Sequence, residues 1–323
     1  MHLHSHMAKQ VIYEIAYFAP FVMTARRNTL TLFWRILRFP IVKLILYLIM
    51  LAILAIIQGT ISDYLNLQNT TSSLGYLGAT LFAIMPFVIA YVVLVKVIEQ
   101  RPISEFAATT AWRGLAQGMI LGVAMMSILV GVMALSGVYH IQGWQDIPWR
   151  DIIEVGIWAG IVEEILLRGV VLRMLEELFG SWAAILLSGL IFGFLHAGNP
   201  NADWWSSTAI AIEAGLLFGV LFCLTRSLWV VIGLHAAWNI AQGPLYGVTV
   251  SGIAQHGIID AQVDGPWWLT GGDFGLEAAL TSVVLSLIIT GYFSYRLAQS
   301  NQVIGPWWRR TVITRDQPPL PPQ

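Results

Sequence analysis

Eight stretches of roughly 20 apolar residues follow one another along this chain, and they limit its fold more than any other feature. A helix of about that length crosses a bilayer, and only helices and closed barrels satisfy their backbone hydrogen bonds in lipid. The stretches lie at about 41–60, 75–96, 114–136, 152–172, 182–198, 206–225, 228–246 and 275–296. The sequence therefore predicts an all-α fold: a polytopic membrane helical bundle with about eight transmembrane helices.

The composition agrees with this interpretation and excludes several classes of function. Only 11% of the residues are charged, whereas a soluble domain carries about 25%, so the chain cannot cover a water-facing surface of ordinary size. The formal net charge of -1 gives no reason to expect nucleic acid as a partner. Cys223 is the only cysteine, which excludes intramolecular disulfides and cysteine metal clusters.

Basic residues and tryptophans predict the topology. With the N-terminal side taken as inside, nearly all lysines and arginines lie in inner segments, Lys43 and Arg168 fall within spans, and Arg150 alone lies outside. The positive-inside rule then places both termini in the cytoplasm and the protein in the cell membrane. Tryptophans favour the headgroup level, and eight of them fall at predicted span ends: Trp144, Trp149, Trp204, Trp205, Trp267, Trp268, Trp307 and Trp308.

Three segments follow from this pattern. Residues 1–40 form an N-terminal cytoplasmic or interfacial segment, in which residues 10–38 mix apolar and basic side chains as an interfacial helix does. Residues 41–298 form the integral membrane domain. Residues 299–323 form a cytoplasmic tail, whose proline-rich end predicts disorder.

Ionisable and amide side chains inside these spans are the candidates for function. Such groups cost a few kcal/mol each in a bilayer and are usually paired and functional. They concentrate in the fourth, fifth and seventh spans, while Glu154 and Glu213 lie nearer the outer ends of the fourth and sixth. The candidates are Glu163, Glu164, Arg168, His196, His235 and Asn239.

Helical spacing separates the roles of the two adjacent glutamates. Glu164 and Arg168 are four residues apart, so they share a face and can form an ion pair. Glu163 is turned about 100° away from them, which leaves its carboxylate free to face another part of the bundle. Each feature also has a purely structural interpretation: a buried ion pair, a core histidine at His196 and an interhelical hydrogen bond at Asn239. Their number across three spans favours a functional site.

The order of these residues on successive helices resembles a known family. The pattern is similar to that of the CPBP family of CAAX-processing and bacteriocin-processing intramembrane proteases, also called Abi, to which the Ras-converting CAAX endoprotease is related. The resemblance covers about residues 95–245. The motifs that carry it are Glu163-Glu164-x-x-x-Arg168, Phe192-x-x-x-His196 and His235-x-x-x-Asn239.

The resemblance implies cleavage of a peptide bond in or beside the membrane, in a membrane-associated or secreted peptide or protein. By the family's motifs, Glu163 is the general base that activates water with the help of His196. Glu164 is held by its arginine and orients the site. His235 and Asn239 donate hydrogen bonds to the developing oxyanion.

A zinc site is the alternative chemistry, because Glu163, His196 and His235 form an acceptable ligand set. The HExxH helix of many zinc proteases is absent from the sequence, and Asn239 has a natural role in an oxyanion hole but none in a zinc site. Both features favour the glutamate-based reaction without settling the choice. Two other functions stay open: an inactive membrane scaffold or bacteriocin-immunity protein, and an ion-coupled transporter, although neither repeats nor broken helices are evident.

Overall fold

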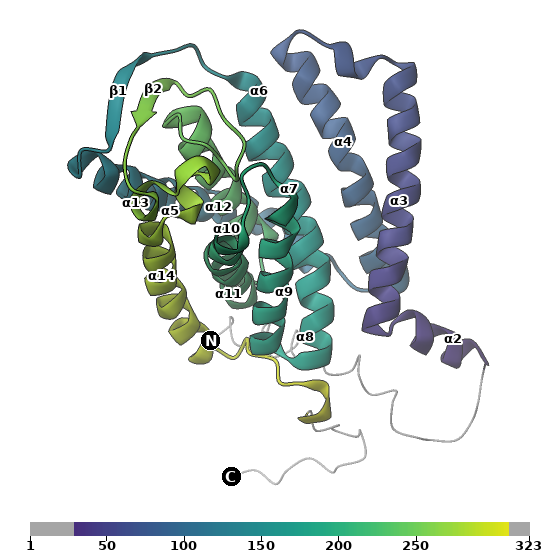
Figure 1. The fold of residues 1–323 in the computed structure, drawn as a ribbon. Coiled ribbons are helices and arrows are strands. Elements are labelled where there is room, and N and C mark those ends of the chain that lie inside the picture. Colours follow the sequence, from purple (N-terminus) through teal and green to yellow (C-terminus); the bar gives the residue numbers. More distant parts are fainter. Residues whose placement is uncertain (1–28, 310–323) are drawn as a thin grey trace.

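The computed structural model describes residues 29–309, and within them the fold is a helical bundle with one small sheet (Figure 1). The predicted tail disorder and the first part of the predicted interfacial helix lie outside the described residues. The helices of seven or more residues are α2 (Thr29–Leu37), α3 (Pro40–Tyr64), α4 (Ser73–Val93), α5 (Ala111–Leu135), α8 (Arg173–Phe179), α9 (Ser181–Leu195), α10 (Trp204–Ile210), α11 (Leu217–Thr225), α12 (Leu228–Ile240) and α14 (Leu280–Ala298).

Shorter helices and π-helical segments join these elements into continuous rods. The short helices are α6 (Trp149–Asp151), α7 (Ala159–Glu164) and α13 (Trp267–Thr270). The π-helical segments are Leu94–Ile98, Ile152–Trp158, Ile165–Leu172, Ala211–Leu216 and Ala241–Leu245. The fourth predicted span is thus part of one helical rod from Trp149 to Phe179, and the fifth ends as an α-helix at Leu195, just before His196.

The prediction of a polytopic membrane bundle is confirmed. Among residues 29–309, six helices are long and apolar enough to cross a membrane. The fourth and seventh predicted spans are helical as well but are not among the six, because the polar motif residues reduce their apolar character. The exact number of spans and the side on which the termini lie stay predictions.

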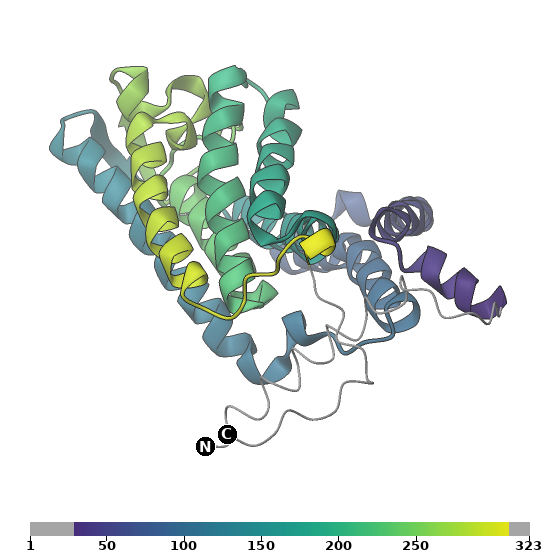
Figure 2. The ribbon, with the colours of Figure 1, turned by 90° about the horizontal axis from the view of Figure 1, so that it is seen from below.

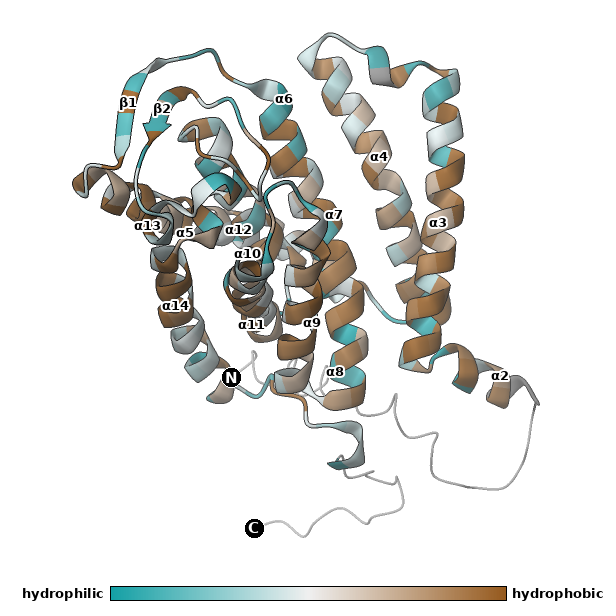
Figure 3. Ribbon diagram, viewed as in Figure 1, coloured by the Kyte–Doolittle hydropathy of each residue, from teal (hydrophilic) through white to brown (hydrophobic). Residues whose placement is uncertain are grey.

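The surface of α3 shows why this bundle belongs in lipid. One face of this helix exposes apolar side chains along its length: Ile45, Ile53 and Ile56 are 50%, 54% and 70% exposed. Figure 3 shows apolar colouring along α3 and α9, whereas the loops around β1 and β2 are largely polar. Figure 1 shows α3 and α4 as a pair beside the rest of the bundle, with α2 lying across the foot of α3.

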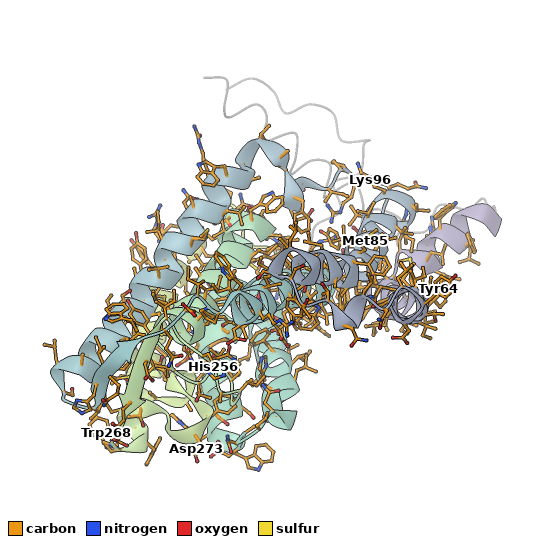
Figure 4. All side chains as sticks on the ribbon, turned by 90° about the horizontal axis from the view of Figure 1, so that it is seen from above. Tyr64, Met85, Lys96, His256, Trp268 and Asp273 are labelled. Carbon is orange, nitrogen blue, oxygen red and sulfur yellow. The ribbon has the colours of Figure 1, made fainter. Side chains whose placement is uncertain are left out.

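The small sheet was not predicted. β1 (Tyr139–Trp144) pairs antiparallel with β2 (Ile259–Val263), with an irregularity between Ile141 and Gly143. The pairing joins segments about 120 residues apart and connects the loop after α5 to the loop before α14. No periodicity along the chain indicates a pairing between such distant segments. The loop at 247–274 therefore has structure of its own, and Figure 4 shows two of its residues, Trp268 and Asp273, on the opposite side of the molecule from Tyr64.

Glycines allow helices of the core to cross at backbone contact. A Cβ atom added at Gly118 of α5 would lie 2.0 Å from the carbonyl oxygen of Val230 in α12, and one at Gly122 would lie 2.6 Å from that of Leu234. Figure 2 shows α5 lengthwise while α3 is seen end-on, so α5 is steeply inclined to the α3–α4 pair. Small residues commonly permit such close approaches between membrane helices.

A close approach of two backbones also occurs at Gly215, in the sixth predicted span. A Cβ atom at this glycine would lie 2.6 Å from the Cα atom of Gly189 in α9, so the two backbones meet directly. Gly219 makes only ordinary contacts, with nothing closer than 3.4 Å. The close approach therefore depends on the first of the two glycines.

A cluster of buried charges joins the ends of α3, α4 and α8. Lys43 is 3% exposed and lies 3.1 Å from Glu99 and 2.6 Å from Glu177. Arg101 and Arg173 each lie 2.7 Å from the other oxygen of Glu99. Burial by itself raises the pKa of Glu99, but the three surrounding cations outweigh it and hold that pKa well below its ordinary value.

Seven of the eight tryptophans predicted at the membrane interface have largely exposed side chains. Trp205 is the exception. It is partly buried, and its indole donates a hydrogen bond to the carbonyl of Ala278 at 2.7 Å. This tryptophan therefore fixes the loop that leads into α14 rather than facing the headgroups.

Candidate active site

The two adjacent glutamates face different groups, as their spacing predicts. Glu164 is fully buried, and its Oε1 lies 2.8 Å from Nη1 of Arg168. The same oxygen accepts a hydrogen bond from Nδ1 of His235, also at 2.8 Å. Glu164 thus links the fourth predicted span to α12 and sets the orientation of the His235 ring. The predicted ion pair is present.

Arg168 is enclosed by acceptors and aromatic rings. Its Nη2 donates to the carbonyl of Ala214 at 2.7 Å and lies 3.4 Å from that of Gly215. The guanidinium carbon lies 4.6 Å from the ring centre of Phe192 and 5.2 Å from that of Phe218, within the range of cation–π attraction. Its carbonyl partners belong to the π-helical segment Ala211–Leu216, where hydrogen bonding departs from the regular i→i−4 pattern.

Glu163 faces the two histidines. Its Oε2 lies 3.9 Å from Nε2 of His196 and 4.0 Å from Nε2 of His235. The Glu163 side chain is 25% exposed, and this oxygen is buried without a hydrogen-bond partner among the described residues. Two imidazoles and a carboxylate from three different helical rods therefore converge on one point.

The backbone determines which nitrogen of His196 faces this point. Its Nδ1 lies 2.9 Å from the carbonyl oxygen of Phe192. A carbonyl only accepts hydrogen bonds, so Nδ1 carries the proton, and in the neutral ring Nε2 presents a lone pair towards Glu163. This geometry depends on His196 lying at the C-terminal end of α9, where the carbonyl four residues earlier is within reach of its side chain.

Asn239 lies one helical turn after His235 on α12, and its side chain hydrogen-bonds to the backbone. Its Nδ2 donates to the carbonyl of Val155 at 2.8 Å, in the π-helical segment Ile152–Trp158. A side-chain amide has two N–H groups, so one remains for another acceptor. The structure thus brings together all six predicted site residues.

A cavity lies next to the histidines, with about 20 Å³ open to the centre of a water molecule. One water needs about 10–15 Å³ measured in this way, so the space holds one or two water-sized groups. Eleven residues line it: Phe192, His196, Ile210, Glu213, Ala214, Phe218, His235, Trp238, Asn239, Ser251 and Glu277.

Two carboxylates in this lining are not among the predicted site residues. Glu213 carries a signal that could have assigned it, because it is an ionisable residue within a predicted span. Glu277 carries the same signal, because it lies near the start of the eighth predicted span at 275–296, but the structure places it in a short 3₁₀ turn before α14, from which it reaches the cavity through the tertiary fold.

The predicted zinc ligands are spaced too widely for a tetrahedral metal centre. Ligand atoms at 2.0–2.2 Å from zinc lie roughly 3.3–3.6 Å from one another, whereas Glu163 Oε2 lies 3.9 and 4.0 Å from the two Nε2 atoms. Among the described residues, no group of three or more His, Cys, Asp or Glu side chains is arranged to hold a metal ion. No step of the reaction below is therefore routed through a metal.

Comparison with known proteins agrees with the motif resemblance. Residues 146–241 match the family model described as type II CAAX prenyl endopeptidase Rce1-like. The match is narrower than the predicted 95–245 but contains every motif residue from Glu163 to Asn239. Neither the search of the curated proteins nor that of the solved structures found a match. Residues 146–241 of this integral membrane protein are thus similar to the CAAX protease family.

Proposed function

We propose that this protein is an intramembrane endopeptidase of the cell membrane, in which Glu163 and His196 activate the attacking water. The observation that carries the proposal is the distance of 3.9 Å between Glu163 Oε2 and His196 Nε2. This distance is too long for a direct hydrogen bond but suits two acceptors that share one water. The family assignment supports proteolysis at the general level.

The water donates its hydrogen bonds to two groups in this arrangement. Glu163 Oε2 has no other partner among the described residues, and the Nε2 lone pair of His196 is directed by the hydrogen bond at Nδ1. As the water oxygen attacks the peptide carbonyl, its proton moves to Glu163, which then passes it to the leaving amine. One C–O bond forms, one C–N bond breaks, and the products are an acid and an amine.

His235 and Asn239 supply the hydrogen bonds for the oxyanion in this proposal. His235 donates from Nδ1 to Glu164, so its Nε2 can donate to an oxyanion only when the ring carries both protons. Asn239 contributes the N–H that is not used by Val155. Fixed donors aimed at a developing negative charge are worth roughly 10²–10³-fold in rate each.

The substrates are membrane-associated or secreted peptides and proteins, and the bilayer is the other partner. The half-exposed apolar face of α3 supports contact with lipid, and the net charge of -1 gives nucleic acid no attraction. Substrates of this class reach a buried cavity from the membrane or from its surface.

The test uses purified protein in lipid nanodiscs and a mixture of peptides with randomised sequences, with cleavage products read by mass spectrometry. Glu163→Gln is expected to lower the rate by about 10²–10⁴-fold, the usual contribution of a general base, without loss of folded protein. Glu154→Gln is the matched control, because Glu154 lies on the same helical rod but is exposed and hydrogen-bonds only Tyr76.

A second measurement addresses the metal. Protein stripped with a chelator and shown by elemental analysis to lack zinc is expected to keep its full activity. Activity that returns only with added zinc would overturn the glutamate-based reaction. Wild-type protein that binds peptides but cleaves none would favour an inactive scaffold instead.

A further inference from the structure

Two carboxylates, Glu213 and Glu277, lie on the wall of the cavity and have no role in the reaction proposed above. Glu213 belongs to the π-helical segment between α10 and α11, and Glu277 to the loop before α14. Both are buried, with 2% and 7% of their surface exposed, and both line the cavity together with His196, His235 and Asn239.

The structure holds the Glu277 carboxylate in place through Ser251. The backbone N–H of Ser251 donates to Glu277 Oε2 at 2.6 Å, and its hydroxyl donates to the same oxygen at 3.0 Å. Ser251 has a φ of 48°, a left-handed conformation that costs energy for a residue with a side chain. Its carbonyl accepts a hydrogen bond from Asn199 Nδ2 at 2.9 Å. A strained serine is thus fixed between α9 and the carboxylate.

The loop that carries Glu277 is equally constrained. Gly275 has a φ of 109°, and a Cβ atom there would lie 2.1 Å from the carbonyl oxygen of Thr249. The carbonyl of Phe274 accepts a hydrogen bond from the backbone N–H of Gly252 at 2.7 Å. On the other side, Trp205 holds Ala278. Several independent contacts therefore position a single buried carboxylate at the cavity.

Glu213 has no such support. Neither of its carboxylate oxygens makes a hydrogen bond of ordinary geometry among the described residues, although the Ser282 hydroxyl lies beside it. A buried carboxylate costs several kcal/mol unless it is paired. A second carboxyl group, that of Glu277, lines the same cavity. Apart from the imidazoles of His196 and His235, the lining contains no basic side chain.

The size and lining of the cavity select the kind of cation. Space for one or two water-sized groups admits the ammonium head of a side chain but not a planar guanidinium, so most of the alkyl stem lies at the mouth of the cavity. The rest of the wall includes Ile210, Phe218 and Trp238, which suit an alkyl stem, and aromatic faces also attract ammonium groups. A Ca²⁺ ion is a poorer fit, because it takes six to eight oxygen ligands.

We infer that Glu213 and Glu277 form a specificity site for a lysine side chain next to the bond that is cleaved. The inference rests on the proposed function, because the lysine must belong to a peptide held beside Glu163 and His196. In this site Glu277 is the preformed anchor, and Glu213 gains its hydrogen bonds when the ammonium binds. The preferred substrates are therefore membrane-associated peptides with lysine at one defined position.

The test compares four peptides that differ only at one residue beside a cleavage site found in the randomised mixture: lysine, arginine, norleucine or glutamine. Wild-type protein is expected to cleave the lysine peptide at least about tenfold more efficiently, by kcat/KM, than the norleucine peptide. In Glu213→Gln this ratio is expected to fall to about one, while the norleucine peptide is still cleaved. Glu154→Gln is expected to keep the wild-type ratio.

Glu277→Gln is expected to lower the same ratio, provided that it elutes as a monodisperse protein. An unchanged ratio in Glu213→Gln would overturn the inference, and so would an arginine peptide cleaved as well as the lysine peptide. Equal loss on the lysine and norleucine peptides would also overturn it, since the pair would then act in the chemistry itself.

Binding separates this site from the proposed reaction. In Glu163→Gln, the lysine peptide is expected to bind at least about tenfold more tightly than the norleucine peptide, and Glu213→Gln in that background is expected to remove the difference. If the wild type cleaves no peptide but the binding difference is present and depends on Glu213, the lysine site stands and the proposed function fails. If the wild type cleaves peptides but the lysine and norleucine peptides bind equally well, the proposed function stands and the lysine site fails.

Discussion

Replacing Arg168 by alanine removes one partner of a buried ion pair together with the other contacts of the guanidinium. The side chain is 1% exposed and lies 2.8 Å from Glu164 Oε1. Its loss leaves Glu164 charged in a dry environment with His235 as its remaining partner. The carbonyl of Ala214 loses its donor, and an unsatisfied buried acceptor costs about 1–3 kcal/mol.

The expected size of the effect follows from the buried pair. Removing one member of such a pair costs about 3–5 kcal/mol, and that figure already includes the stranded carboxylate. The contacts of Arg168 with Phe192 and Phe218 add no separate amount to this free energy, because the effects of neighbouring groups are not additive. Since whole proteins are stable by about 5–15 kcal/mol, Arg168→Ala is expected to accumulate poorly. On the scaling for domains of 150–250 residues, its Tm falls by roughly 6–20 °C.

The assay is thermal unfolding in detergent, followed by size-exclusion chromatography of heated samples, with proteolytic activity measured on the folded fraction. Arg296→Ala is the matched control, since Arg296 is exposed and, among the described residues, its hydrogen bond is to Tyr292. Its Tm is expected to stay within about 2 °C of wild type. The double variant Glu164→Gln/Arg168→Met is expected to be more stable than Arg168→Ala, because it removes the stranded charge. A wild-type Tm for Arg168→Ala, or a double variant no more stable than the single one, would refute the reasoning.

Two further predictions concern packing and pH. Gly118→Ala is expected to destabilise the fold by about 1–3 kcal/mol, because the new Cβ atom would meet the carbonyl of Val230. Gly131→Ala is the control, because a Cβ atom at Gly131 has nothing within 4 Å. Equal Tm values for the two variants would contradict the backbone contact. The pKa of Glu99 is lower in the folded protein than in the unfolded chain, so the folded state binds fewer protons. Stability from this group is present above about pH 4.3 and is lost as the pH falls through and below that value. Thermal unfolding at pH 7, 4 and 3 is expected to show a smaller fall in Tm for Glu99→Gln than for wild type, and parallel profiles would contradict this role of the buried cations.

The ion pair and the helical bundle could be predicted because both depend on local regularities. The apolar stretches predict helices wherever lipid demands internal hydrogen bonding. Two residues four apart on a helix share a face, so Glu164 and Arg168 were expected to pair, and they do. The different directions in which Glu163 and Glu164 point follow from the same helical period.

Other details of the site depend on contacts between distant segments. The direction of the His196 ring depends on α9 ending at Leu195, a boundary that an apolar run does not define. The partners of Arg168 in the segment Ala211–Leu216 lie more than 40 residues away along the chain. Helical spacing indicates which face a residue occupies but does not identify the neighbouring helix that will contact that face.

The sequence by itself determined that the chain is a membrane helical bundle with three polar motifs at membrane depth, because the cost of burying polar groups in lipid acts on each span separately. The tertiary structure decided what surrounds those motifs. Glu277 reaches the cavity through the left-handed backbone of Gly275 and the hydrogen bonds from Ser251. These contacts form only when the loops after α12 and before α14 fold over the bundle. The eighth predicted span marks Glu277 as an ionisable residue at membrane depth, but no pattern along the chain indicates that it lies beside His196 and His235.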